Sequence, residues 1–188
     1  MTDIPFYLLS DKDNRQAMNA AINLPGVNTV DVLHRNIIPP GPVMLTKNYG
    51  SKLMDLVNAA NGLVLLSNRI FRIFEENNVT GWERIPAEIH PGNGVINHDY
   101  SLLTITGKCV TIDFSKSETV IKQPITPTGK AISIRRGIYF DMNDWDGSDI
   151  FGAENTLFTF ITDKVRRLLI DNKATNILIE KTTDFELY

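Results

Sequence analysis

The stretch Phe158 to Ile179, F-T-F-I-T-D-K-V-R-R-L-L-I-D-N-K-A-T-N-I-L-I, occurs in the chain a second time in related form. Shifted back by 95 positions, it aligns without a gap on Leu63 to Arg84, L-V-L-L-S-N-R-I-F-R-I-F-E-E-N-N-V-T-G-W-E-R. Three aligned pairs are identical, and most of the others are similar in kind. The identical pairs are Arg72/Arg167, Asn77/Asn172 and Thr80/Thr175.

Each copy has the pattern of a strand followed by a helix. Ser67 and Thr162 come after a short apolar run, and each can cap a helix because its hydroxyl can accept from an amide of the first turn. Asn77 and Asn172 stop the helical pattern, since asparagine tolerates the left-handed conformation that ends many helices. Between cap and stop lie the apolar residues of one helix face, which are Ile70, Ile73 and Phe74 in one copy and Val165, Leu168 and Leu169 in the other.

A second strand follows each helix. Thr80-Gly81 and Thr175-Asn176 are turn pairs, and they lead into the predicted strands Trp82–Ile85 and Ile177–Ile179. Two explanations of the match remain open at this point. The chain contains a duplication, or two ordinary units obey the same capping and turn rules.

The composition is that of a globular protein. Apolar residues make up 43% and charged residues 22% of the 188 residues, which fits one domain over 1–188, with an N-terminal arm and loops over 1–45 and a core over 46–188. No apolar run reaches the roughly 20 residues of a transmembrane helix, and the N-terminus lacks a basic start, so we expect a cytoplasmic protein without a membrane partner. A net charge of -3 with dispersed basic residues argues against a nucleic-acid partner.

Further elements are predicted outside the repeated stretch. Ser51 precedes Leu53, Leu56, Val57 and Ala60, a pattern typical of a capped helix that ends at Asn61-Gly62. Residues 103–105 and 110–114 alternate around Gly107-Lys108, which predicts a β-hairpin. Ile132 to Phe140 predicts another strand, with Arg136 and Gly137 at a bulge. The predicted fold class is α+β: one mixed domain with a central antiparallel sheet that contains the hairpin, and two similar helix-strand units.

The densest like-charge cluster in the chain consists of four aspartates, Asp141, Asp144, Asp146 and Asp149. Trp145 lies among them. A helix-loop-helix calcium site needs oxygen ligands at positions 1, 3 and 5 and glycine at position 6, and no register of this segment supplies them. Two interpretations remain. The segment binds a partner, with Trp145 as an anchor in a negative field that steers a basic protein surface. Alternatively it is a solvated turn in which the carboxylates bind nearby amides and Trp145 folds inward.

No pattern of residues indicates catalysis, and the sequence predicts no metal and no cofactor. The spacing of His90 and His98 suits neither a zinc protease helix nor a zinc finger. Cys109 has no patterned base beside it, and as the single cysteine it forms neither an internal disulfide nor a thiolate zinc site. Gly147 lacks the second glycine of a nucleophile elbow, and Gly129 lacks the earlier glycine of a phosphate loop.

Several segments resemble one family. These are S-x-R-I-x-x-I-F-E-x-x-x-V-T-G-W (Ser67 to Trp82), Y-x-L-L-x-I (Tyr100 to Ile105), W-D-G-S-D-I-F (Trp145 to Phe151) and the closing T-D-K-V-R-R-L-L segment. They are similar to bacterial polymorphic-toxin immunity proteins, and most to their eleventh named family, the myxobacterial type once catalogued as a domain of unknown function. Some relatives carry paired C-x-x-C-G zinc motifs, which this chain lacks.

The resemblance implies a non-catalytic protein that binds and neutralises a cognate toxin encoded nearby. The failure of every catalytic motif is what this interpretation expects. The alternatives are a metal-dependent hydrolase that uses the Asp141–Asp149 loop with His90 or His98, and a structural adaptor domain.

Overall fold

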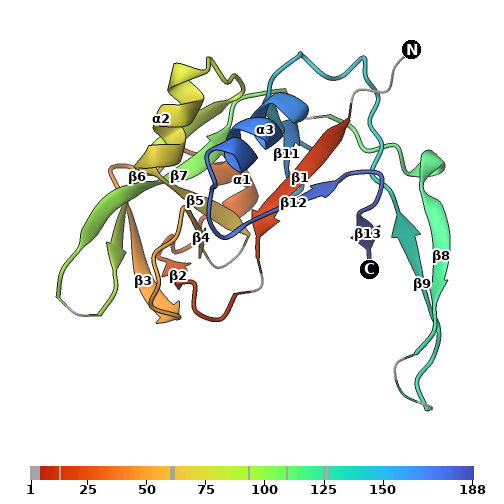
Figure 1. Ribbon diagram of the computed structural model, residues 1–188, viewed down its shortest axis with the longest axis horizontal. Helices are drawn as coiled ribbons and strands as arrows, with labels where there is room; N and C mark the ends of the chain where they lie inside the picture. Colours follow the sequence, from red (N-terminus) through yellow and green to blue (C-terminus); the bar gives the residue numbers. More distant parts are fainter. Residues whose placement is uncertain are drawn as a thin grey trace.

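Strands dominate the structure. The computed structural model describes residues 5–12, 14–59, 62–92, 94–108, 110–124, 126 and 128–188, and Figure 1 shows their arrangement. Strands account for 42% of the residues and helices for 15%. The predicted α+β class is therefore wrong, because the helices are only short segments laid on a β-barrel and two further sheets.

Six strands close into a barrel. Its order is β2-β3-β6-β7-β5-β4, and a parallel contact between β4 and β2 closes it. Its interior belongs to the larger of two hydrophobic cores, in which Leu65, Leu102 and Ile89 are fully buried. The barrel strands are β2 (Asn19–Ile22), β3 (Val43–Tyr49), β4 (Leu56–Ala59), β5 (Leu63–Ser67), β6 (Trp82–His90) and β7 (Asn97–Ile105).

A second, open sheet has the order β10-β11-β1-β12. The N-terminal strand β1 lies inside it and pairs with β11 on one side and with β12 on the other, both antiparallel. Phe6, Phe151 and Phe160 of this sheet form the smaller core together with Phe140. The strands are β1 (Phe6–Asp11), β10 (Ile150–Gly152), β11 (Thr159–Thr162) and β12 (Ile177–Lys181).

Three short helices cover these sheets. The helices α2 (Asn68–Glu76) and α3 (Asp163–Asp171) begin directly after β5 and β11 and lie side by side in Figure 1, while α1 (Thr29–Leu33) precedes β3. In the described part of the chain, no helix is long and apolar enough to cross a membrane. The helices α2 and α3 include residues 70–74 and 165–169, where the repeated stretch predicts helices.

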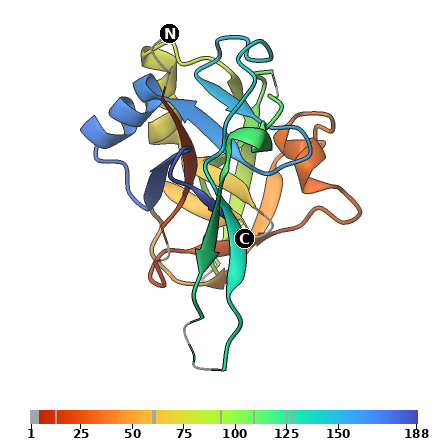
Figure 2. The ribbon, with the colours of Figure 1, turned by 90° about the vertical axis from the view of Figure 1, so that its right-hand side faces the viewer.

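A third sheet projects from the body. It has the order β13-β9-β8, and β8 (Glu118–Lys122) and β9 (Ile132–Arg136) form a long hairpin that extends away from the barrel and the open sheet (Figures 1 and 2). On the other edge of β9, the short β13 (Glu186–Leu187), near the C-terminus, pairs with Arg135 and Arg136. The 3-10 helix η1 (Phe114–Lys116) leads into the hairpin.

Two sets of four strands have the same topology. In the barrel the order is β4-β5-β7-β6 and in the open sheet it is β10-β11-β1-β12, and neighbours within each set are antiparallel. The registers agree as well: Ser67 pairs with Tyr100 as Thr162 pairs with Phe6. The N-terminal β1 therefore takes the place in the second set that β7 has in the first.

Two local predictions are wrong for identifiable reasons. The segment expected to be a helix over 53–60 contains strand β4, in which the consecutive residues Leu56 and Val57 are both buried. Successive strand residues point to opposite faces, so both faces of β4 are covered, with β1 among its neighbours. Asn61, its expected end, lies outside the described residues. The hairpin around Gly107 does not form, since the amides of Thr106 and Gly107 donate to the Gly81 carbonyl, at 3.0 and 3.1 Å.

The two segments expected to pair in that hairpin have different partners. β7 ends at Ile105, whereas Ile112 forms an isolated antiparallel bridge with Phe140. Cys109 lies outside the described residues. The strand predicted over 132–140 is present only as β9, because Gly137 adopts a φ of +91°, which breaks the extended backbone after Arg136.

Candidate functional site

The tryptophan of the acidic segment points into the protein. The Trp145 ring packs edge-on against Phe6, with centroids 5.1 Å apart, and its Nε1 donates to the Ser148 carbonyl at 3.1 Å. An aromatic side chain held in this way contributes to the smaller core. The structure therefore gives Trp145 an intramolecular role, and its role as a partner anchor stays a prediction.

Asp146 holds the local turn. Its carboxylate accepts from the amides of Lys108 and Ser148, both at 2.9 Å. Partial burial disfavours the ionised form, but the hydrogen bonds from Ser148 and Lys108 outweigh it, so the pKa of Asp146 lies below its ordinary value. The carboxylate stays charged at neutral pH while both oxygens serve the loop.

Asp149 connects the two repeated segments. Its Oδ1 accepts from the Thr162 hydroxyl at 3.1 Å, and its Oδ2 accepts from the Thr80 amide at 3.1 Å and from Lys164 Nζ at 2.8 Å. We call Asp149, Thr80, Thr162 and Lys164 the Asp149 cluster. Burial opposes ionisation of Asp149, but the hydrogen bonds from Lys164 and Thr80 outweigh it and lower its pKa.

Sequence reasoning missed the counterpart of Asp149. Asp55 accepts from the Ser67 hydroxyl at 2.9 Å, from the Thr175 amide at 2.8 Å and from Arg69 Nη2 at 2.6 Å. These four residues, the Asp55 cluster, are the repeat equivalents of the Asp149 cluster. Burial alone would raise the pKa of Asp55, but the hydrogen bonds from Arg69, Thr175 and Ser67 lower it to about 2.

The clusters also correct the predicted caps. Ser67 and Thr162 do stand at the N-caps of α2 and α3, yet neither side chain accepts from a helix amide. Their hydroxyls donate to Asp55 and Asp149 instead. Asp55 could have been found from its position 94 residues before Asp149, which is within one residue of the spacing of 95 between Thr80 and Thr175.

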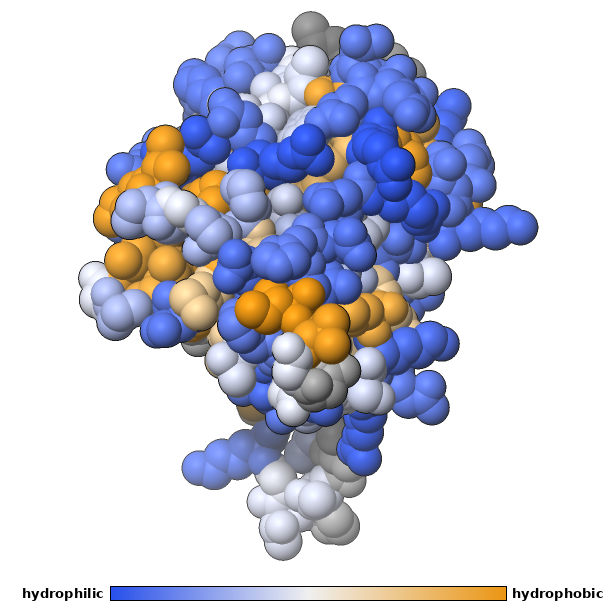
Figure 3. All heavy atoms as spheres, turned by 90° about the vertical axis from the view of Figure 1, so that its left-hand side faces the viewer, coloured by the Kyte–Doolittle hydropathy of each residue, from blue (hydrophilic) through white to orange (hydrophobic). Residues whose placement is uncertain are grey.

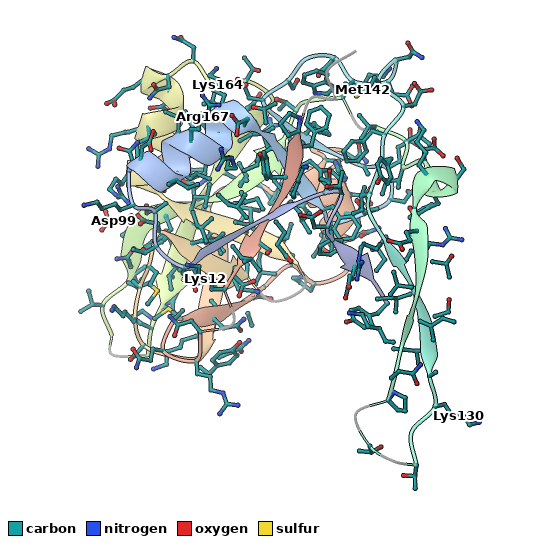
Figure 4. All side chains as sticks on the ribbon, turned by 45° about the vertical axis from the view of Figure 1, so that its right-hand side comes forward. Lys12, Asp99, Lys130, Met142, Lys164 and Arg167 are labelled. Atoms are coloured by element: carbon teal, nitrogen blue, oxygen red, sulfur yellow. The ribbon has the colours of Figure 1, made fainter. Side chains whose placement is uncertain are left out.

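The remaining two aspartates lie at or near the surface. Asp141 is exposed, and its Oδ1 accepts from the amide and the side-chain nitrogen of Asn143, both at 3.0 Å. Asp144 is half-buried and lines an open pocket of about 610 Å³ with Lys116 and the exposed Met142. Figure 4 shows Met142 at the upper rim of the molecule, away from the barrel. We call Asp141, Met142 and Asp144 the acidic rim.

The histidines of the hydrolase alternative lie on the barrel instead. His90 ends β6 and His98 lies in β7, and their ring nitrogens are 4.0 and 3.9 Å from the carboxylate of Glu88. No described contact joins them to the Asp141–Asp149 loop. Within the described ranges, no three His, Cys, Asp or Glu side chains are grouped in a way that could hold a metal ion.

The apolar surface of the barrel side is divided into patches. On the face in Figure 3, hydrophobic side chains form separate patches among hydrophilic ones. Exposed apolar residues of the barrel and its connections include Met44 on β3, and Val95 and Ile96 between β6 and β7. Small separate patches are ordinary on a monomer surface, so they do not define a binding site by themselves.

Comparison with known proteins identifies a family. The sequence model of the immunity protein family Imm11 matches residues 17–184, nearly the whole chain. No curated protein matches the sequence significantly. The match agrees with the family that the motifs between Ser67 and Phe151 resemble.

Proposed function

We propose a function from the premise that the chain belongs to the Imm11 family of immunity proteins. The protein binds a cognate bacterial toxin directly and neutralises it without catalysing a reaction. The toxin is encoded nearby, and the complex forms in the cytoplasm of the cell that the protein protects. The single observation that carries this proposal is the family match over residues 17–184.

The architecture is compatible with a binding protein. Asp55 and Asp149, its two most extensively hydrogen-bonded carboxylates, are occupied in joining the repeated segments. A neutraliser needs a surface of roughly 800 Å² on its own side and a few anchoring residues, not a reactive constellation. The same reasoning disfavours the hydrolase, whose His90 and His98 face Glu88 on the barrel.

We further propose that the acidic segment contributes to the interface. Asp141 and Asp144 present outward charge beside Met142, which suits a basic surface of the toxin. Trp145, Asp146 and Asp149 hold the neighbouring backbone in place through their contacts with Phe6, Lys108 and Lys164. Their contribution to binding would therefore be indirect.

The test is protection and complex formation with the neighbouring toxin. Cells that express the toxin should survive when this protein is co-expressed, and the two purified proteins should elute together. Asp141→Asn with Asp144→Asn should slow association at low salt, with little change at moderate salt, because screening already masks steering there. Glu76→Gln with Asp99→Asn is the control, because it makes the same change of net charge at exposed positions of the body. Absence of protection and of complex would refute the function, whereas an unchanged association rate would refute only the role of the acidic rim.

A further inference from the structure

The hairpin over residues 116–136 has a structural base and a free outer part. At the base, Ile134 is 3% exposed, Arg136 pairs with Glu186 at 3.0 Å, and the Gly137 amide donates to the Phe185 carbonyl at 2.8 Å. Farther out, Ile121 is 65% and Ile132 48% exposed. Figures 1 and 2 show this outer part projecting well beyond the body. Its apolar side chains therefore do nothing for the core.

The internal symmetry shows that the fold itself does not require the projection. Residues 106–148 stand before Asp149 as residues 12–54 stand before Asp55, and the two segments have equal length. The segment 12–54 supplies β2 and β3, which close the barrel. The segment 106–148 instead sends β8 and β9 into solvent, so its outer part has no counterpart in the packing of the other half.

The hairpin and the rest of the chain carry net charges of opposite sign. Residues 116–136 contain five basic side chains and one acidic one, Glu118, which gives a net charge of +4 in a chain of net -3, so the remaining residues carry -7. Part of the positive charge is matched, since Lys122 lies 2.8 Å from Glu186. Lys130 and Arg135 have no ion-pair partner among the described residues, although the Arg135 guanidinium lies over the Phe114 ring, 4.9 Å from its centroid. Figure 4 shows Lys130 pointing away from the body. The five basic residues are Lys116, Lys122, Lys130, Arg135 and Arg136.

The two exposed isoleucines lie on opposite faces of the hairpin. Ile121 pairs with Ser133, and the neighbouring pair is Lys122 with Ile132, so the side chains of Ile121 and Ile132 point to different sides. A flat partner surface would cover only one of them. A partner that covers both must be a cleft that receives the hairpin.

We propose that this hairpin inserts into an acidic cleft of the cognate toxin. Ile121 and Ile132 contact the two walls, while Lys130 faces carboxylates inside the cleft and Arg135, at the base of the hairpin, faces carboxylates at its mouth. This inference rests on the proposed function and names the surface that performs it. A body of charge -7 repels nucleic acid and anionic membranes, which favours a protein partner with localised acidic groups.

The base of the hairpin borders the acidic rim. Lys116, at the start of the hairpin, lines the same pocket as Asp141 and Asp144, whereas Lys130 lies at the opposite end of the molecule from Met142 (Figure 4). A toxin that contacts the base of the hairpin therefore meets both positive and negative charge there. Such alternating charge fixes the orientation of a partner and discriminates against others.

Two double variants test the proposal in the full chain against the toxin encoded beside it. Lys130→Glu with Arg135→Glu reverses the unpaired charges, and Ile121→Ser with Ile132→Ser removes the apolar contacts. Lys12→Glu with Arg15→Glu is the matched control, because it makes the same change of net charge at exposed positions of the body. The binding constant is measured at low and moderate salt, and thermal unfolding is followed for every variant.

Both hairpin variants should weaken binding by about tenfold or more, with unfolding temperatures close to wild type and an unaffected control. The effect of charge reversal should shrink as salt rises. If the wild type binds the toxin and neither hairpin variant binds more weakly, the hairpin proposal is overturned and the proposed function stands. Failure of wild type to bind overturns both. The hairpin proposal is also overturned if Lys130 and Arg135 are needed to bind duplex DNA, anionic vesicles or a second copy of the chain, while toxin binding does not depend on them.

Discussion

Asp55 and Asp149 hold equivalent positions in the two halves of the protein, and each joins its own half to the other. Asp55 binds the N-cap residue Ser67 of its own half and Thr175 of the second half, whereas Asp149 binds Thr162 of its own half and Thr80 of the first. The exchange is reciprocal. It explains why the polar residues of the repeated stretch match as well as the apolar ones.

Backbone hydrogen bonds next to each carboxylate also join the two halves. The amide of Leu56 donates to the Thr175 carbonyl, and the amide of Ile150 donates to the Thr80 carbonyl, at 3.2 and 3.0 Å. At the next position Gly81 has a φ of +87°, and a Cβ there would lie 2.0 Å from the Ile150 carbonyl oxygen. Together with the matching strand registers, these contacts favour a duplication over chance similarity of capping rules.

The first prediction concerns the carboxylates themselves. Asp55→Asn and Asp149→Asn should each lower the free energy of unfolding by about 1–3 kcal/mol, because partly buried donors lose a charged acceptor. Asp141→Asn, at an exposed site, should change it by less than about 0.5 kcal/mol. Denaturant unfolding at neutral pH measures all three. Equal stability of Asp55→Asn and Asp141→Asn would mean that the Asp55 cluster does not join the halves.

The second prediction is a loss of stability in acid. The pKa of Asp55 falls from 3.8 to about 2 on folding, and that of Asp149 also falls. A carboxyl with a lowered folded-state pKa stabilises the fold above its unfolded pKa and ceases to do so as pH drops through the folded value. The stability difference between wild type and Asp55→Asn should therefore narrow from pH 3.8 to about pH 2. A difference that stays constant across this window would contradict the assignment.

The third prediction tests the apolar face of α2. Ile73 is 8% exposed, so Ile73→Asp buries an unpaired carboxylate and should unfold the protein, at a cost of several kcal/mol. Ile170→Asp on α3 is the control, because Ile170 is 54% exposed and its replacement stays solvated. Circular dichroism and thermal melting distinguish the two. A melting temperature of Ile73→Asp equal to that of wild type would show that the face is assigned wrongly.

The fourth prediction concerns the N-terminal strand. Because β1 pairs with both β11 and β12, deletion of residues 1–11 should leave an unfolded or aggregated chain. Addition of a peptide of residues 1–11 in trans should restore folded signal, as expected for an inner strand. Deletion of Tyr188, which is 85% exposed, is the control. A folded, monomeric 12–188 fragment would show that β1 is dispensable.

Sequence reasoning succeeded where local physics decides structure. The spacing of Ile70, Ile73 and Phe74 was sufficient to place α2, and the corresponding residues were sufficient for α3. The left-handed residues come one position later than expected, at Asn78 and Lys173, while Asn77 and Asn172 bind the preceding turn through their side chains.

It failed where distant segments pair. Nothing in Phe6–Asp11 indicates that its partners are β11 and β12, at the other end of the chain. The burial of β4 on two sides depends likewise on closure of the barrel, which no local pattern reveals. For the candidate site, the sequence identified the acidic segment but not which of its members face inward, because Trp145 meets its partner Phe6 only in the folded protein.

The most direct test of the central claim is a titration of the activity of the neighbouring toxin with this protein. Stoichiometric binding predicts that toxin activity falls linearly and vanishes near one molar equivalent, with a complex of the same composition. An enzyme that inactivates the toxin would act at far less than one equivalent and progressively with time. Complete inactivation by a catalytic amount, or undiminished toxin activity at an excess, would contradict the account.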